Sequence, residues 1–232
     1  MTAAGASAAL EDIGDRTADE LVAQARSEIS AAATSNRFLD LLERREIPRE
    51  RLEWLAGEEY RIVGSDRRSF ALLGARYPEP PSGQLFLSLA QGEAQALALL
   101  FDFAAALGLS EKDLRAYEPQ PFAQAYAAYI AQRAMFGTAA EVALAMVANL
   151  EEWGSYCGRA ASALGSRYGM GDSAIRFFGF FAESPPGFAE QATAVIASGL
   201  AAGEDPGDIA RAPRLLHAYE TAFWNSLVEG LP

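Results

Sequence analysis

Most of the chain lacks any regular alternation of apolar and polar residues, and this restricts its fold more than any other feature. Ala, Leu and Glu dominate, while Val, Ile and Thr rarely alternate with polar residues over four or more positions. Alternation marks half-buried strands, whereas Ala, Leu and Glu favour helices. The sequence therefore predicts an all-α fold.

Pro- and Gly-rich segments divide the chain into separate helices. They fall at YPEPPSG (77–83), YEPQP (117–121), SPPG (184–187) and AAGEDPG (201–207), which are typical of turns. Capping boxes indicate helix starts at Thr17 and Thr138, and Ser110 suits the same role. Pro48 and Pro206 suit the first turn of a helix.

Between these marks the sequence predicts ten helices. They lie near 17–33, 36–44, 49–76, 84–107, 110–116, 120–135, 139–165, 172–182, 186–202 and 207–229. Long helices joined by short loops indicate a helical bundle. We expect one domain over 1–232, with residues 1–12 as a flexible leader.

Charge and composition limit the partners. The chain has 31 acidic and 19 basic residues, a net charge of −12, which repels phosphate backbones and anionic membranes. We therefore expect no nucleic acid and no membrane as partners. One cysteine, Cys157, excludes an internal disulfide and predicts a cytoplasmic location, and we expect it to be buried and unreactive. Because haem and catalytic metal sites usually need histidines and His217 is the only one, we expect neither a metal nor a cofactor.

Polar residues interrupt the most apolar predicted helix in the stretch ANLEEWGSYCGRA (148–160). Taking Asn149 as zero, Glu152 lies at about −60°, Trp153 at about +40° and Tyr156 at about −20° around the helix axis. These four therefore share one face. It is either an inward polar and aromatic surface for a small ligand or an exposed face, with Glu151 and Glu152 in water.

Two further stretches carry candidate carboxyl groups. In RLEWLAGEEYRIV (51–63), Glu59 extends an apolar line toward the core, while we expect Glu58 to turn away. In LLHAYETAFWNSL (215–227), Glu220 borders an apolar line that includes Tyr219. A carboxyl group in such surroundings has a raised pKa, as general acid–base catalysis requires. Solvated glutamates remain the alternative interpretation for both.

Three segments in order resemble the TenA/thiaminase II (TENA/THI-4/PQQC) family. They are NRFLDLLERREIPRERLEWLAGEEYRIV (36–63), FAAALGLSEKDLRAYEPQPFAQAYAAYI (103–130) with TAAEVALAMVANLEEW (138–153), and YETAFW (219–224). The resemblance implies a haem-oxygenase-like helical bundle and a homo-oligomer, either a dimer or a tetramer. It also implies a pocket for a small molecule, toward which the face of Asn149 and Trp153 would point.

The resemblance also implies roles for individual residues. The pyrimidine-binding Asp of the family falls on Glu59, a pocket Tyr on Tyr126 and the catalytic Glu on Glu220. In contrast, a second pocket Tyr falls on Ile62 and the nucleophilic Cys on Asn149.

The loss of the cysteine removes the usual covalent mechanism, because an Asn amide is no nucleophile. The resemblance then implies hydrolysis by glutamates, with Glu152 and Glu220 as an acid–base pair acting on bound water. Tyr126, Asn149, Trp153, Tyr156 and Tyr219 join Glu59 as the predicted substrate-binding set. Three hypotheses remain: a cofactor-free hydrolase of a thiamine-related aminopyrimidine, a non-catalytic binding protein, or an enzyme of the same fold with an unrelated substrate.

Overall fold

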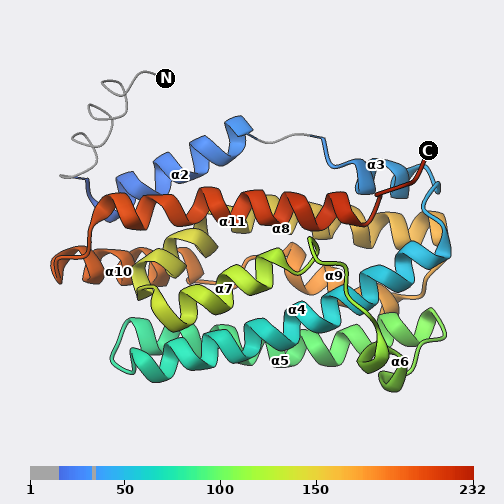
Figure 1. The fold of residues 1–232 in the computed structure, drawn as a ribbon, viewed down its shortest axis with the longest axis horizontal. Coiled ribbons are helices and arrows are strands. Elements are labelled where there is room, and N and C mark those ends of the chain that lie inside the picture. Colours follow the sequence, from blue (N-terminus) through green and yellow to red (C-terminus); the bar gives the residue numbers. More distant parts are fainter. Residues whose placement is uncertain (1–15, 33–34) are drawn as a thin grey trace.

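The computed structural model describes residues 16–32 and 35–232, and within these ranges the chain is built of helices without strands (Figure 1). The helices are α2 (Ala18–Ala32), α3 (Arg37–Glu43), α4 (Arg49–Arg76), α5 (Ser82–Ala106), α6 (Glu111–Ala116), α7 (Ala125–Phe136), α8 (Ala139–Tyr168), α9 (Asp172–Ala182), α10 (Phe188–Ala201) and α11 (Pro206–Ser226). The all-α prediction is confirmed. The predicted leader at 1–12 lies outside the described residues.

The helix starts follow the capping signals. Thr138 and Glu141 exchange side-chain and backbone hydrogen bonds at the start of α8, and Ser110 does the same with Asp113 at α6. Pro206 occupies the first turn of α11, whereas Pro48 is the residue before α4 rather than part of its first turn. Side-chain hydrogen bonds of this kind also cap the starts of α2, α3 and α11.

Helix α7 begins at Ala125, five residues later than predicted, and a buried carboxylate explains the delay. Glu58 accepts hydrogen bonds from the Tyr117 hydroxyl at 2.7 Å, the backbone N–H of Gln120 at 2.6 Å and the side-chain amide of Gln124. These bonds hold the segment before α7 in a non-helical conformation. The expectation that Glu58 turns away from the core is wrong, since its side chain is fully buried.

Helix α8 lies inside the bundle, and six other helices pack on it: α2, α3, α7, α9, α10 and α11. On the other side, α4 and α5 run side by side, with α7 packed on α4 (Figure 1). The apolar core forms two clusters, one around Phe38, Leu55 and Phe177 and one around Leu21, Phe86 and Val195. A cavity of the protein lies between these two clusters.

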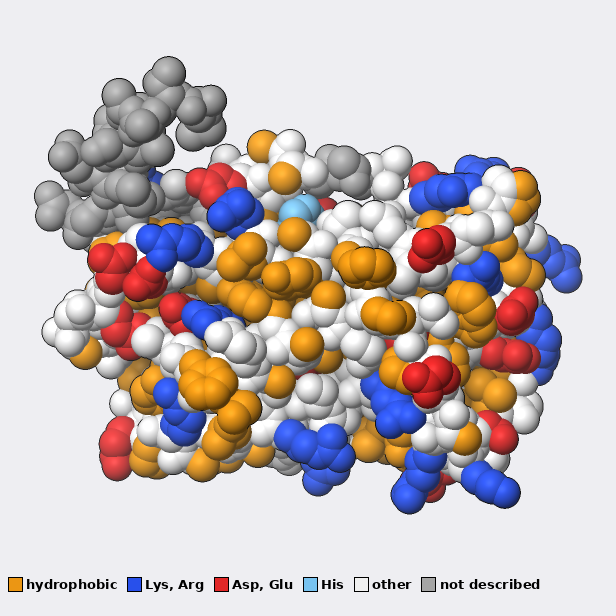
Figure 2. Space-filling view, viewed as in Figure 1, with side chains coloured by type: hydrophobic (Ala, Val, Ile, Leu, Met, Phe, Trp, Pro, Cys, Tyr) orange, Lys and Arg blue, Asp and Glu red, His pale blue; other side chains and the backbone are white. Residues whose placement is uncertain are grey.

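The surface is charged and mixed. Figure 2 shows Lys, Arg, Asp and Glu side chains across the face that it draws, with apolar groups between them. Of the described helices, none combines the length and the apolar character that crossing a lipid bilayer would require.

We predict that Gly57→Ala destabilises the protein whereas Gly64→Ala does not. A Cβ atom on Gly57 would lie 2.4 Å from the Tyr117 ring, while one on Gly64 would meet nothing within 4 Å. Both glycines lie in α4, so both changes gain helix propensity. Overpacking costs about 1–3 kcal/mol, which thermal or urea unfolding would measure. Equal midpoints for the two variants would contradict this account of the α4 contact with Tyr117.

Candidate functional site

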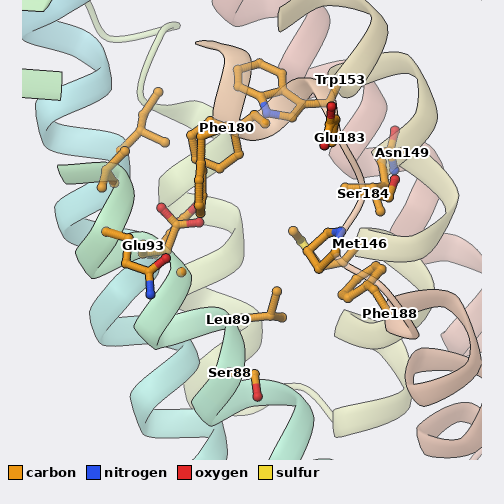
Figure 3. A pocket seen from close by; sticks show the side chains of 18 of the residues that line it. Ser88, Leu89, Glu93, Met146, Asn149, Trp153, Phe180, Glu183, Ser184 and Phe188 are labelled. Carbon is orange, nitrogen blue, oxygen red and sulfur yellow. The ribbon is translucent and has the colours of Figure 1, made fainter. Parts of the chain in front are cut away.

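A cavity of about 690 Å³ lies between the two apolar clusters. Figure 3 shows Met146, Asn149 and Trp153 of α8 on one side and Ser88, Leu89 and Glu93 of α5 opposite them. The connection between α9 and α10 contributes Glu183 and Ser184 to its wall, and Phe188 at the start of α10 adjoins them. Further lining residues come from the remaining core helices: Glu59, Ile62, Val63, Asp66, Tyr126, Leu216, Glu220 and Phe223.

Two carboxyl groups of α4 lie buried in this wall. Glu59 and Asp66 are 1% and 3% exposed, and one oxygen of each has no hydrogen-bond partner. Burial raises the pKa of Glu59 to about 8, with the neighbouring Asp66 and Glu58 adding to the effect. Burial likewise raises the pKa of Asp66 to about 7, although a hydrogen bond from Tyr126 opposes it. At neutral pH both groups are therefore poised to gain or lose a proton.

Glu93 and Glu220 add two more carboxyl groups from α5 and α11. Both side chains are half-buried, and both line the cavity. Burial raises both pKa values well above normal, and nearby Asp66 raises each further. Among the described residues that line the cavity there is no Lys, Arg or His, so these carboxyl groups have no positive neighbour there.

Asn149 lies in the wall with its amide held in one orientation. Its Nδ2 donates hydrogen bonds to the carbonyl oxygens of Ala145 at 2.8 Å and Pro213 at 3.2 Å. Because both partners are acceptors, the amide nitrogen must face them, and Oδ1 is left without a partner although the residue is buried. At the position where the resemblance expects a thiolate, this chain offers a fixed hydrogen-bond acceptor.

Behind Glu220, the Glu152 side chain pairs with His217. The His217 Nδ1 atom lies 2.9 Å from Glu152 Oε2, though poorly aligned for a hydrogen bond, and the Tyr156 hydroxyl donates to Glu152 Oε1 at 2.9 Å. Burial alone would raise the pKa of Glu152, but these two partners outweigh it and lower that pKa. Figure 2 shows the histidine at the surface, so this group of residues lies between the cavity wall and solvent.

Although we expect neither a metal nor a cofactor from the sequence, one group among the described residues lies at metal-ligand spacing. One ligand-type atom from each of Glu152, His217 and Glu220 lies within 4.8 Å of the others. The 2.9 Å contact between His217 Nδ1 and Glu152 Oε2 accounts for two of the three being close.

The predicted site residues are thus divided between two places. The cavity lining contains Glu59, Tyr126, Asn149, Trp153 and Glu220 but not Glu152, Tyr156 or Tyr219. Tyr156 packs edge-on against Trp224, and Tyr219 lies against the Tyr129 ring. On the predicted face of α8, Asn149 and Trp153 line the cavity. Glu152 and Tyr156 of the same face instead contact residues of α11.

Sequence reasoning missed Asp66 and Glu93. Asp66 follows Glu59 by seven residues, which places both on one face of a helix, and that apolar line continues through Phe70 and Leu73. An acidic residue inside such a line was a usable signal. Glu93 had no comparable signal, because α5 has polar residues on several sides of its middle turns.

Known proteins resemble this chain in sequence and fold. Residues 24–165 match the model of the TENA/THI-4/PQQC family, while no match is found among curated proteins. A domain of unknown function with a heme oxygenase-like fold from Shewanella denitrificans OS217 superposes with a TM-score of 0.71 at 15% identity, covering 90% of this chain and 89% of that one. A TenA homologue from P. horikoshii OT3 gives 0.69 at 16% identity, with coverage of 91% and 98%. A protein described as a TenA family transcription regulator from Silicibacter sp. TM1040 gives 0.67 at 16% identity, with coverage of 88% and 96%.

We predict that Cys157 is unreactive and dispensable. Its side chain is fully buried, and burial, reinforced by Glu59 and Glu220, raises its pKa well above that of a free thiol. Iodoacetamide should therefore leave the native protein unmodified under conditions that alkylate the urea-unfolded chain completely. Cys157→Ser should cost about 1 kcal/mol of stability and leave ligand binding unchanged. Ligand-protected alkylation that abolishes activity would show instead that the thiol belongs to the site.

Proposed function

This chain belongs to the TENA/THI-4/PQQC family, and from that premise we propose that it is a cofactor-free hydrolase of a thiamine-related aminopyrimidine, acting in thiamine salvage. In this proposal a water molecule activated by a glutamate replaces the cysteine nucleophile of the family. The fold similarity supports the scaffold alone, because the solved relatives share only 15–16% identity with this chain. The case for the chemistry rests on the side chains around the cavity.

One observation carries the proposal: Glu220 lies on the cavity wall, and its pKa is raised while that of Glu152 behind it is lowered. Two neighbouring carboxyl groups whose pKa values move apart can hold different protonation states at one pH. Glu220 is then the group that touches the substrate. Glu152, held by His217 and Tyr156, positions it and keeps a negative charge beside it.

The reaction that fits these groups is direct attack by water. A protonated nitrogen on the substrate favours ionised Glu220, which takes a proton from a bound water molecule. The water oxygen forms a bond to the carbon that carries the amino group, and the carbon–nitrogen bond breaks. Glu220 then returns the proton to the departing nitrogen, so that an amine and water become an alcohol and ammonia.

A second candidate function is binding without catalysis. The observation in its favour is Asn149, whose clamped amide stands where the family resemblance expects the nucleophile. A protein that had lost catalysis would keep the cavity and its hydrogen-bonding groups without needing a reactive side chain. The two functions differ in what they require of Glu220.

We predict that Glu220→Gln lowers turnover of an aminopyrimidine bearing an aminomethyl group by about 10²–10⁴-fold. The amide cannot transfer the proton, but it keeps the shape of the side chain, so substrate affinity should change only severalfold. Ammonia release measures turnover, and calorimetry measures affinity. Glu229→Gln, which removes an exposed carboxyl group just beyond α11, is the matched control. Turnover in Glu220→Gln within about threefold of wild type, well short of that range, would favour the binding function.

We further predict that turnover is insensitive to chelators. If Glu220 activates water itself, dialysis against EDTA should leave the rate unchanged, and elemental analysis should find no stoichiometric iron or zinc. The alternative is a metal held by Glu152, His217 and Glu220, the three residues at ligand spacing. In that case EDTA would abolish turnover, and His217→Gln would abolish metal binding.

A further inference from the structure

Three buried oxygens around the cavity lack a hydrogen-bond donor. They are Glu59 Oε1, Asp66 Oδ1 and Asn149 Oδ1, and all three residues line the cavity while being no more than 3% exposed. Leaving a buried polar group without a hydrogen-bond partner is unfavourable. Buried acceptors without donors, on three residues that line one cavity, therefore indicate a ligand that brings several N–H groups.

The spacing of these oxygens requires donors on separate parts of the ligand. Glu59 and Asp66 are seven residues apart in α4, which places their Cα atoms about 10 Å apart along the helix axis. Asn149 belongs to α8, on another wall. Within the part of the chain that the structure describes, these residues form no group at metal-ligand spacing. A single ion would therefore not satisfy them, whereas an extended molecule would.

The charge of the cavity specifies the kind of donor. Glu59, Asp66, Glu93 and Glu220 share it, with no positive side chain among the described lining residues. A buried carboxylate is stable only beside a positive charge or a set of donors. The ligand must then supply the positive charge that the protein lacks.

We propose that the cavity binds a small organic diamine in its dicationic form, with one ammonium group at Glu59 and the other at Asp66, and with Glu93 facing both. The cavity walls also carry apolar side chains, among them Leu89, Met146 and Phe180, and these suit a short hydrocarbon body. Asn149 Oδ1 accepts a further N–H. The inference deepens the proposed function and rests on it only in assigning the substrate to this cavity; Asp66 and Glu93 are its new determinants.

Binding of a dication has a defined proton balance. In the empty cavity the pKa of Glu59 is about 8 and that of Asp66 about 7, so both hold protons below these values. The other titratable groups acting on them are Glu58, Glu93, Tyr126 and Glu220. An ammonium group favours the carboxylate, so binding lowers these pKa values and releases protons. Affinity must then rise with pH through about 6–8, because alkyl amines keep their charge up to about pH 10.

The test is calorimetry of the purified protein with 1,4-diaminobutane, 1-aminobutane and 1,4-butanediol. We expect the diamine to bind at least tenfold more tightly than the monoamine, and the diol not to bind. Titrations in phosphate and in Tris, which differ in ionisation enthalpy, should show proton release with the diamine. Its Kd should fall by up to about tenfold per pH unit for each proton released.

Two variants assign the second ammonium group. Asp66→Asn and Glu93→Gln should weaken diamine binding at least tenfold, reduce proton release and leave monoamine binding within threefold. Because each removes a buried carboxyl group without a positive partner, the unliganded variants should melt no lower than wild type, which separates lost binding from lost folding. Glu50→Gln, which removes an exposed carboxyl group from the same α4, should change none of these values.

Several results would overturn the inference. Equal affinity for the monoamine would leave only one charged position, and equal affinity for the diol would show that charge is not recognised. Absence of diamine binding, or binding unaffected by Asp66→Asn and Glu93→Gln, would exclude the assignment. Ammonia release from an aminopyrimidine is measured separately, so a hydrolase that ignores diamines would refute this inference alone. Diamine binding without hydrolysis would refute only the catalytic proposal.

Discussion

Helix α8 is covered by neighbours along most of its length, and each polar group on it must find a partner within the protein. From Ala139 to Asn149 nearly every side chain is buried, and small residues let other segments approach closely, as Gly154 does with the Phe181 carbonyl. Helix α11 supplies these partners: the Pro213 carbonyl accepts a hydrogen bond from Asn149, and His217 contacts Glu152. The packing of α8 on α11 therefore fixes both the cavity wall and the residues behind it.

The buried carboxyl groups of the cavity lower the stability of the helical bundle. Burying a carboxyl group that has no positive partner favours the neutral form and opposes folding when the group is charged. Apolar burial in the two clusters on either side offsets this loss of stability. Such local destabilisation is typical of sites that recognise a ligand, because the missing interaction is completed only when the ligand arrives.

The sequence predicted the helices well because caps and Pro/Gly segments act locally. It also placed Glu59 correctly toward the interior, since Glu59 continues an apolar line. It failed for Glu58 and for the pairing of Glu152 with His217, because these depend on which helices meet. A helical wheel gives the direction of a side chain but not what lies opposite. Helical periodicity therefore could not tell a side chain that lines the cavity, such as Asn149, from one that packs on α11, such as Tyr156.

The delayed start of α7 has a consequence for how this chain can vary in length. The segment before Ala125 is held by Glu58 through the Tyr117 hydroxyl, Gln120 and Gln124, and α7 then carries Tyr126 to the cavity. One residue inserted there would rotate the helix that follows by about 100° and turn the tyrosine away from Asp66. This connection is accordingly closed to insertions and deletions, although it is a loop between helices, where changes in length are ordinarily accepted.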